Sequence, residues 1–178
     1  MISLSSKSDW LDYMQESYLY FTEVKSEMNY SFGFSWKGFL IVILPMIPNL
    51  FYFLFPNAIS SGSTVISHLA LDIIEHGSQA IYIALLIFLI AKKDVFMHSP
   101  YIICMIIFLL SYYVLWILLF AGNKNLLVLI CMAVFPVIYF ILAEIWLCNF
   151  LAIIPTAIFG VVHIIITYMD FHATYLRL

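Results

Sequence analysis

The sequence predicts an all-α integral membrane protein, a five-helix bundle preceded by an N-terminal amphipathic helix. Of its 178 residues, 65% are apolar and 10% are charged, and the mean hydropathy is +1.08. Soluble domains hold about 45–50% apolar and about 25% charged residues. Hydrophobic runs near or above the roughly 18 residues of a membrane-span candidate recur five times along the chain. Composition and run length therefore predict both the fold class and the lipid bilayer as a partner.

Residues 1–36 form a polar segment unlike the rest of the chain. Its apolar residues recur at three- and four-residue steps, at Trp10, Tyr13, Met14, Phe21, Val24 and Met28. This spacing predicts an amphipathic helix that lies on the membrane surface or against the bundle. Its net acidity favours docking on protein over binding to anionic lipid. The alternative is an arm that binds a protein partner.

Residues 37–171 are predicted to form the transmembrane domain, and residues 172–178 a short C-terminal tail. The predicted spans cover about 38–55, 65–91, 100–121, 126–147 and 150–169. A helix needs about 20 residues to cross a hydrocarbon core of roughly 30 Å, and each run has or approaches that length.

Basic residues are unevenly divided between the two sides of the predicted membrane domain. The side that holds the N-terminus carries Lys25, Lys37, Lys92 and Lys93. The opposite side carries Lys124 and Arg177. The positive-inside rule therefore favours an N-in, C-out orientation.

The composition also argues against several functions. A net charge of −3 and a pI near 5.9 argue against nucleic acid as a partner. The three cysteines form no CxxC pair, which argues against thiol redox chemistry and a cysteine-built zinc site. No lysine or arginine interrupts the interior of a predicted span, which excludes a retinal Schiff base or an arginine voltage sensor. No cofactor is predicted, and the oligomeric state stays open.

The second predicted span carries a stripe of polar residues. His68, Asp72, Glu75 and Gln79 fall within about 60° of one another on a helical wheel, and His76 widens the stripe. A central carboxylate costs about 2.5–3.5 kcal/mol on insertion scales, so such a stripe is expected to face the bundle interior or a water-filled cavity.

The fifth predicted span carries a second stripe, made of Thr156, Gly160, His163, Thr167 and Asp170. The depths of these positions predict that His163 lies at the level of the acidic stripe, together with Asn49 of the first span. The sequence thus predicts a polar pocket that opens towards the outer face. Its proposed ligand-binding residues are Asn49, Asp72, Glu75, His76, Gln79 and His163.

Two other features bear on this pocket. Pro45 and Pro48 each remove a backbone donor, so a neighbouring helix, water or a cavity is expected to satisfy the carbonyl one turn earlier. Glu144, at the inner end of the fourth span, is expected at the membrane interface or as a hairpin cap rather than in the site.

Three classes of function fit these residues. The first is binding or transport of a small polar ligand or a proton at the pocket. The second is an accessory, assembly or immunity subunit without catalytic activity, in which the stripe is a structural hydrogen-bond network. The third is an intramembrane metal-dependent hydrolase with His68, Asp72, His76 and His163 as ligands. Their spacing matches no metalloenzyme signature, so an enzyme is not favoured and the primary prediction includes no metal.

Three stretches, GFLIVILPMIPNLFYFLFPN, LDIIEHGSQ and PTAIFGVVHIIITYMDF, resemble small uncharacterised multi-pass membrane proteins of Firmicutes. The resemblance covers about residues 38–171 and implies that Asn49, Glu75 and His163 belong to one recurrent feature. It implies no activity. An arginine of that family corresponds here to Gln79, which removes an ion pair. The resemblance and the isoleucine-rich, aromatic composition favour a bacterial plasma membrane.

Overall fold

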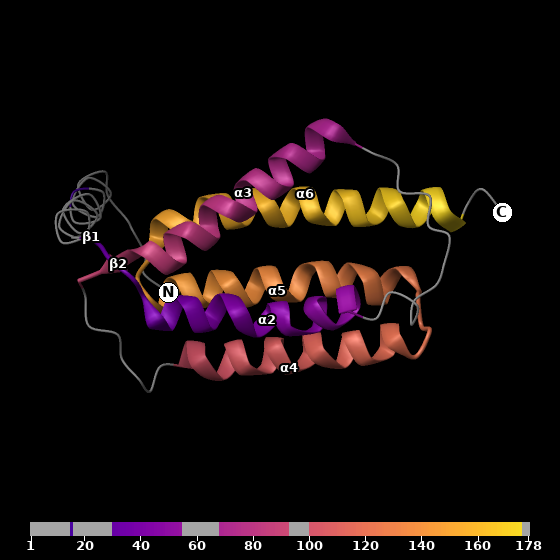
Figure 1. Cartoon of the computed structure of the whole chain (residues 1–178), viewed down its shortest axis with the longest axis horizontal. Helices are drawn as coiled ribbons and strands as arrows, with labels where there is room; N and C mark the ends of the chain where they lie inside the picture. The colour runs from indigo at the N-terminus through magenta and orange to yellow at the C-terminus, as the bar shows by residue number, and fades with distance from the viewer. Residues whose placement is uncertain (1–14, 16–29, 55–67, 93–99, 176–178) are drawn as a thin grey trace, which may run out of the picture.

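The computed structural model describes residue 15 and residues 30–54, 68–92 and 100–175. The described elements are β1 (Tyr30–Phe32), α2 (Trp36–Leu54), α3 (Leu69–Phe88), β2 (Leu89–Ala91), α4 (Pro100–Phe120), α5 (Leu126–Trp146) and α6 (Phe150–Tyr175) (Figure 1). The all-α fold class is confirmed, and the helices α2 to α6 fall on the five hydrophobic segments of the sequence. The predicted N-terminal amphipathic helix lies outside the described residues, apart from the helical Gln15.

Four of these helices, α3, α4, α5 and α6, are long and apolar enough to cross a membrane, judged by length and composition. The apolar part of α2, Trp36–Tyr52, is shorter than a full span. Large apolar side chains cover the outer faces, for example Leu127 (72% exposed) and Ile117 (65% exposed). Such a surface suits lipid rather than water, so the chain is a multi-pass membrane protein.

The helices pack in two antiparallel pairs. Helix α3 lies along α6 and α4 along α5, while α5 also packs on α6 and joins the pairs; α2 contacts α3, α4 and α5 (Figure 1). A Cβ added at Gly160 would lie 2.6 Å from Cγ1 of Val137, so α5 and α6 approach closely because this residue has no side chain. Gly38 plays the same part between α2 and α3, where an added Cβ would lie 1.9 Å from the Leu86 carbonyl oxygen.

Helix α3 ends earlier than predicted, at Phe88, because the chain turns into an extended strand. Strand β2 pairs antiparallel with β1, with Ser31 opposite Ile90. The backbone N–H of Gly33 donates to the Phe88 carbonyl at 3.0 Å, which supplies a partner at the helix end. The second predicted span, drawn through residue 91, therefore ends as a helix at residue 88, and residues 30–32 of the predicted polar segment form the partner strand.

The C-terminal helix is longer than the sequence predicted. Helix α6 continues to Tyr175, so part of the predicted tail at 172–178 is helical. No glycine or proline follows Met169 to stop the helix, and Asp170 and His172 are accommodated within it.

The turn between α5 and α6 is tight and is fixed by a buried asparagine. Cys148 adopts a left-handed conformation with φ of 54°, and Asn149 is 1% exposed. The Asn149 Nδ2 group donates to the carbonyl oxygens of Leu85 (2.8 Å) and Leu89 (3.2 Å). This hairpin is thereby bound to the junction of α3 and β2, and Asn149 adds a second donor to the Leu85 carbonyl, which also accepts from the Leu89 N–H.

Both prolines of α2 are buried, and tyrosines of neighbouring helices satisfy the carbonyls that they free. The hydroxyl of Tyr139 on α5 donates to the carbonyl oxygen of Ile41, four residues before Pro45, at 3.2 Å. The hydroxyl of Tyr113 on α4 donates at 2.6 Å to the carbonyl of residue 44, four residues before Pro48. The expectation that a neighbour satisfies these groups is confirmed.

Candidate functional site

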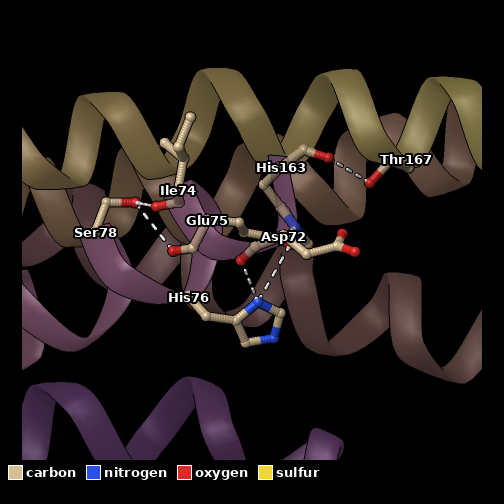
Figure 2. A network of polar contacts seen from close by, with 7 residues as sticks. All are labelled: Asp72, Ile74, Glu75, His76, Ser78, His163 and Thr167. Carbon is tan, nitrogen blue, oxygen red and sulfur yellow. Dashed lines mark hydrogen bonds and ion pairs between the residues drawn. The ribbon is translucent and has the colours of Figure 1, made fainter. Parts of the chain in front are cut away.

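Two side chains from different helices meet near the middle of the bundle. Nδ1 of His163 on α6 donates a hydrogen bond to Oε1 of Glu75 on α3 (Figure 2). Glu75 is 9% exposed and His163 is half-buried. The sequence expectation that the two polar stripes face each other is confirmed at this contact, which we call the Glu75–His163 pair.

The surroundings of the pair hold both side chains in place. The imidazole of His163 stacks on Phe159, with centroids 5.1 Å apart and an interplanar angle of 15°. The Thr167 hydroxyl donates to the His163 backbone carbonyl at 2.8 Å. On α3, the Ser78 hydroxyl donates to the Glu75 carbonyl at 3.0 Å (Figure 2). These local bonds and the ring stack restrict the orientations available to the pair.

A cavity of about 130 Å³ lies beside the pair, with walls from α2 to α6. Its lining residues are Val42, Pro45, Met46, Asn49, Gln79, Tyr82, Ile83, Tyr112, Met132, Pro136, Phe140, Phe159 and His163. Three of the six predicted ligand-binding residues, Asn49, Gln79 and His163, therefore share one cavity. A cavity needs about 10–15 Å³ to hold one water, so the volume of this one is enough for several.

Two amide side chains on the cavity wall lie near tyrosines. Asn49 lies close enough to the Tyr112 hydroxyl to interact with it, and Gln79 does the same with Tyr82. Amide and hydroxyl groups both donate and accept hydrogen bonds, so the wall offers both functions to a small polar guest.

His76 does not join the cavity. Its side chain is 74% exposed and points away from α6 (Figure 2). Its Nδ1 donates to the Asp72 backbone carbonyl at 2.8 Å and lies 3.9 Å from Oε2 of Glu75. The position of His76 at the edge of the predicted stripe explains this, because the next residue after an inward-facing one rotates about 100° around the helix.

Asp72 and His68 lie nearer the beginning of α3, away from the cavity wall. Both act electrostatically on Asp170 of α6, as does Glu75, so acidic and imidazole groups extend from the pair towards this end of the bundle. His68 is half-buried, and its Nε2 makes no hydrogen bond.

The described residues hold no group of three or more His, Cys, Asp or Glu side chains placed to bind a metal ion. The alternative ligand set of His68, Asp72, His76 and His163 is thus not gathered at one point. The His76 side chain faces outwards, away from α6, and His163 is hydrogen-bonded to Glu75.

Glu144, expected at the membrane interface or as a hairpin cap, lies near the α5–α6 turn with its side chain buried inside the bundle. It is 0% exposed and accepts a hydrogen bond at Oε1 from the Thr156 hydroxyl, while its Oε2 is buried without a partner. The short α5–α6 turn folds α6 directly over it, which excludes water. The signal in the sequence was Thr156, which belongs to the same polar stripe as His163.

The chain matches no protein-family model, no curated protein and no solved structure in comparisons with known proteins.

Proposed function

We propose that the protein binds or transports a proton or a small polar ligand at the Glu75–His163 pair and the adjoining cavity. The observation that carries this proposal is the hydrogen bond between Glu75 and His163 at a cavity also lined by Asn49 and Gln79. We further propose a bacterial plasma membrane as its location, with the N-terminus inside, which the lysine distribution and the family resemblance favour.

The chemistry of the pair suits proton exchange. The Glu75 carboxyl group and the His163 imidazole each bind a proton, so the hydrogen-bonded pair changes its net charge when one proton enters or leaves. Ionisable groups within membrane helices are costly and commonly mark proton relays or ligand sites. Because Glu75 and His163 lie on different helices, a change in their charge also acts on how α3 and α6 pack.

The cavity limits the ligand to a small one. About 130 Å³ accommodates several waters or a compact polar molecule rather than a lipid chain. Its mixture of amide, hydroxyl and imidazole groups with aromatic walls favours a neutral or singly charged guest. The two amides supply donors and acceptors without requiring a counter-ion.

Proton movement can be tested with the full chain reconstituted in liposomes that enclose a pH-sensitive dye. Under an imposed pH gradient, we expect Glu75→Gln to reduce protein-dependent proton flux at least about tenfold, since the amide cannot exchange a proton. His76→Gln is the matched control, because that neighbouring residue faces outwards. Unchanged flux in the Glu75→Gln protein would refute the proton proposal.

The accessory-subunit alternative makes a different prediction from the same variants. The pair also joins α3 to α6, and a purely structural pair stabilises the bundle without taking part in exchange. In that case Glu75→Gln lowers the unfolding temperature but leaves any flux equal to that of the His76→Gln control. Measurement of stability and flux on the same preparations separates the two functions.

A further inference from the structure

Glu144 is a second buried acid, and it does not belong to the Glu75–His163 pair. It is 0% exposed, and among the described residues no ion pair includes it. One carboxyl oxygen accepts from Thr156, which is also 0% exposed, and the other has no hydrogen-bond partner. A bare carboxylate in such surroundings is far more costly than a neutral carboxylic acid.

Among the described residues, the groups that pack around Glu144 supply no compensating positive charge. Helix α3 presents Tyr82, α6 presents the uncharged Thr156, and α4 contributes Met105 to the apolar cluster around this part of α5. Lys37 of α2 lies over an aromatic ring of α5, 5.7 Å from its centroid. A bound proton is therefore the cation that fits the geometry and neutralises the Glu144 carboxylate.

The position of Glu144 relates it to the pair described above. Its partner Thr156 lies seven residues before His163 on the same inward stripe of α6, which is about 10 Å along the helix. Tyr82 lines the cavity, lies within electrostatic reach of Glu144 and packs on Phe159 with centroids 5.5 Å apart. Phe159 in turn stacks on His163.

We propose that Glu144 is a second proton-binding group of the protein, connected with the Glu75–His163 pair through Tyr82 and water in the cavity. The proton binds at the free Oε2 and leaves Oε1 to accept from Thr156. The two acids then lie at different depths of one polar route through the bundle. The role of this second site rests on the proposed function, but the protonation of Glu144 is tested independently of it.

Infrared spectroscopy of the full chain in lipid tests the protonation directly. A protonated carboxyl group gives a C=O stretch that is separate from the carboxylate bands. We expect this band in the wild-type protein at neutral pH, its loss in Glu144→Gln and its retention in Glu75→Gln. Absence of the band from the wild-type protein, or its persistence in Glu144→Gln, would overturn the proposal.

Two further variants complete the test. One keeps the assignment testable if Glu144→Gln does not fold, and the other tests the connection to the cavity. Thr156→Val removes the hydrogen bond to Oε1 without removing the acid, so we expect the band to shift and not disappear. If Glu144→Gln does not fold, an unshifted band in Thr156→Val overturns the assignment. Tyr82→Phe is expected to slow proton–deuteron exchange at this band at least about tenfold, and an unchanged rate would exclude the Tyr82 connection.

The outcomes for the two acids are distinguishable. If the carboxyl band assigns to Glu144 while Glu75→Gln leaves proton flux unchanged, the second site exists and the function proposed for the pair is wrong. If Glu75→Gln abolishes flux but no band assigns to Glu144, the pair acts without this second group.

Discussion

The tyrosine hydroxyls that bond to α2 can be tested by a double-mutant cycle. In the native protein, Pro45 cannot donate to the Ile41 carbonyl, and the Tyr139 hydroxyl takes its place at 3.2 Å. Tyr139→Phe removes that donor and leaves the carbonyl unpaired. In a Pro45→Ala background the helix regains its own N–H at this position, so the same Tyr139→Phe change should cost little.

The expected magnitude follows from burial. Tyr139 is 3% exposed, so water does not replace its hydroxyl after the change. An unsatisfied buried acceptor costs about 1–3 kcal/mol, and measured polar couplings within membrane proteins reach at most about 1.7 kcal/mol. We therefore expect Tyr139→Phe to lower the free energy of unfolding by about 1–2 kcal/mol alone and by less than about 0.5 kcal/mol beside Pro45→Ala.

Unfolding of the purified protein by a denaturing detergent in mixed micelles, followed by circular dichroism, measures all four members of the cycle. Any packing defect caused by Pro45→Ala alone is common to two members and cancels in the coupling. Tyr168→Phe is a suitable control, because that ring is 49% exposed. Equal costs of Tyr139→Phe in the two backgrounds would show that the hydroxyl does not substitute for the missing N–H.

The same unfolding assay checks three other contacts. Gly160→Ala should destabilise the protein by about 1–3 kcal/mol through overpacking against Val137, and Val137→Ala should restore most of that loss; destabilisation without rescue would contradict the contact. Asn149→Ala should cost about 1–3 kcal/mol because it removes one bond to α3 and one to β2, and a change below about 0.5 kcal/mol would contradict these bonds. His163→Ala should lower the free energy of unfolding whereas His76→Ala should not, since His76 is 74% exposed; equal effects would contradict the geometry.

The features that the sequence predicted correctly depend on periodicity. Five hydrophobic segments become helices because their length and composition leave no other regular structure in lipid. Glu75 and His163 each lie on a polar stripe, and a stripe flanked by apolar faces has to turn towards the protein interior. Their contact therefore followed from two helical wheels and a comparison of depth.

The features that the sequence missed depend on contacts between distant residues. Strand β2 is three apolar residues that continue the hydrophobic run of α3, and a run of that kind does not reveal where helix gives way to strand. The burial of Glu144 was not predicted because it arises from the tight α5–α6 turn and not from its own neighbours in sequence. His76 was included because it lies at the edge of the polar stripe, and a helical wheel does not show which edge of the stripe the neighbouring helix covers.

The dependence of α2 on later helices has a consequence for the order of synthesis. The chain emerges from its N-terminus, so α2 is complete before Tyr113 of α4 and Tyr139 of α5 exist. At roughly 5–20 residues per second, the last of these tyrosines follows about 5–20 seconds later. During that interval two carbonyls of α2 require water or the insertion machinery as partners. Helix α2 is thus made before α4 and α5 but acquires its final hydrogen bonds only after them.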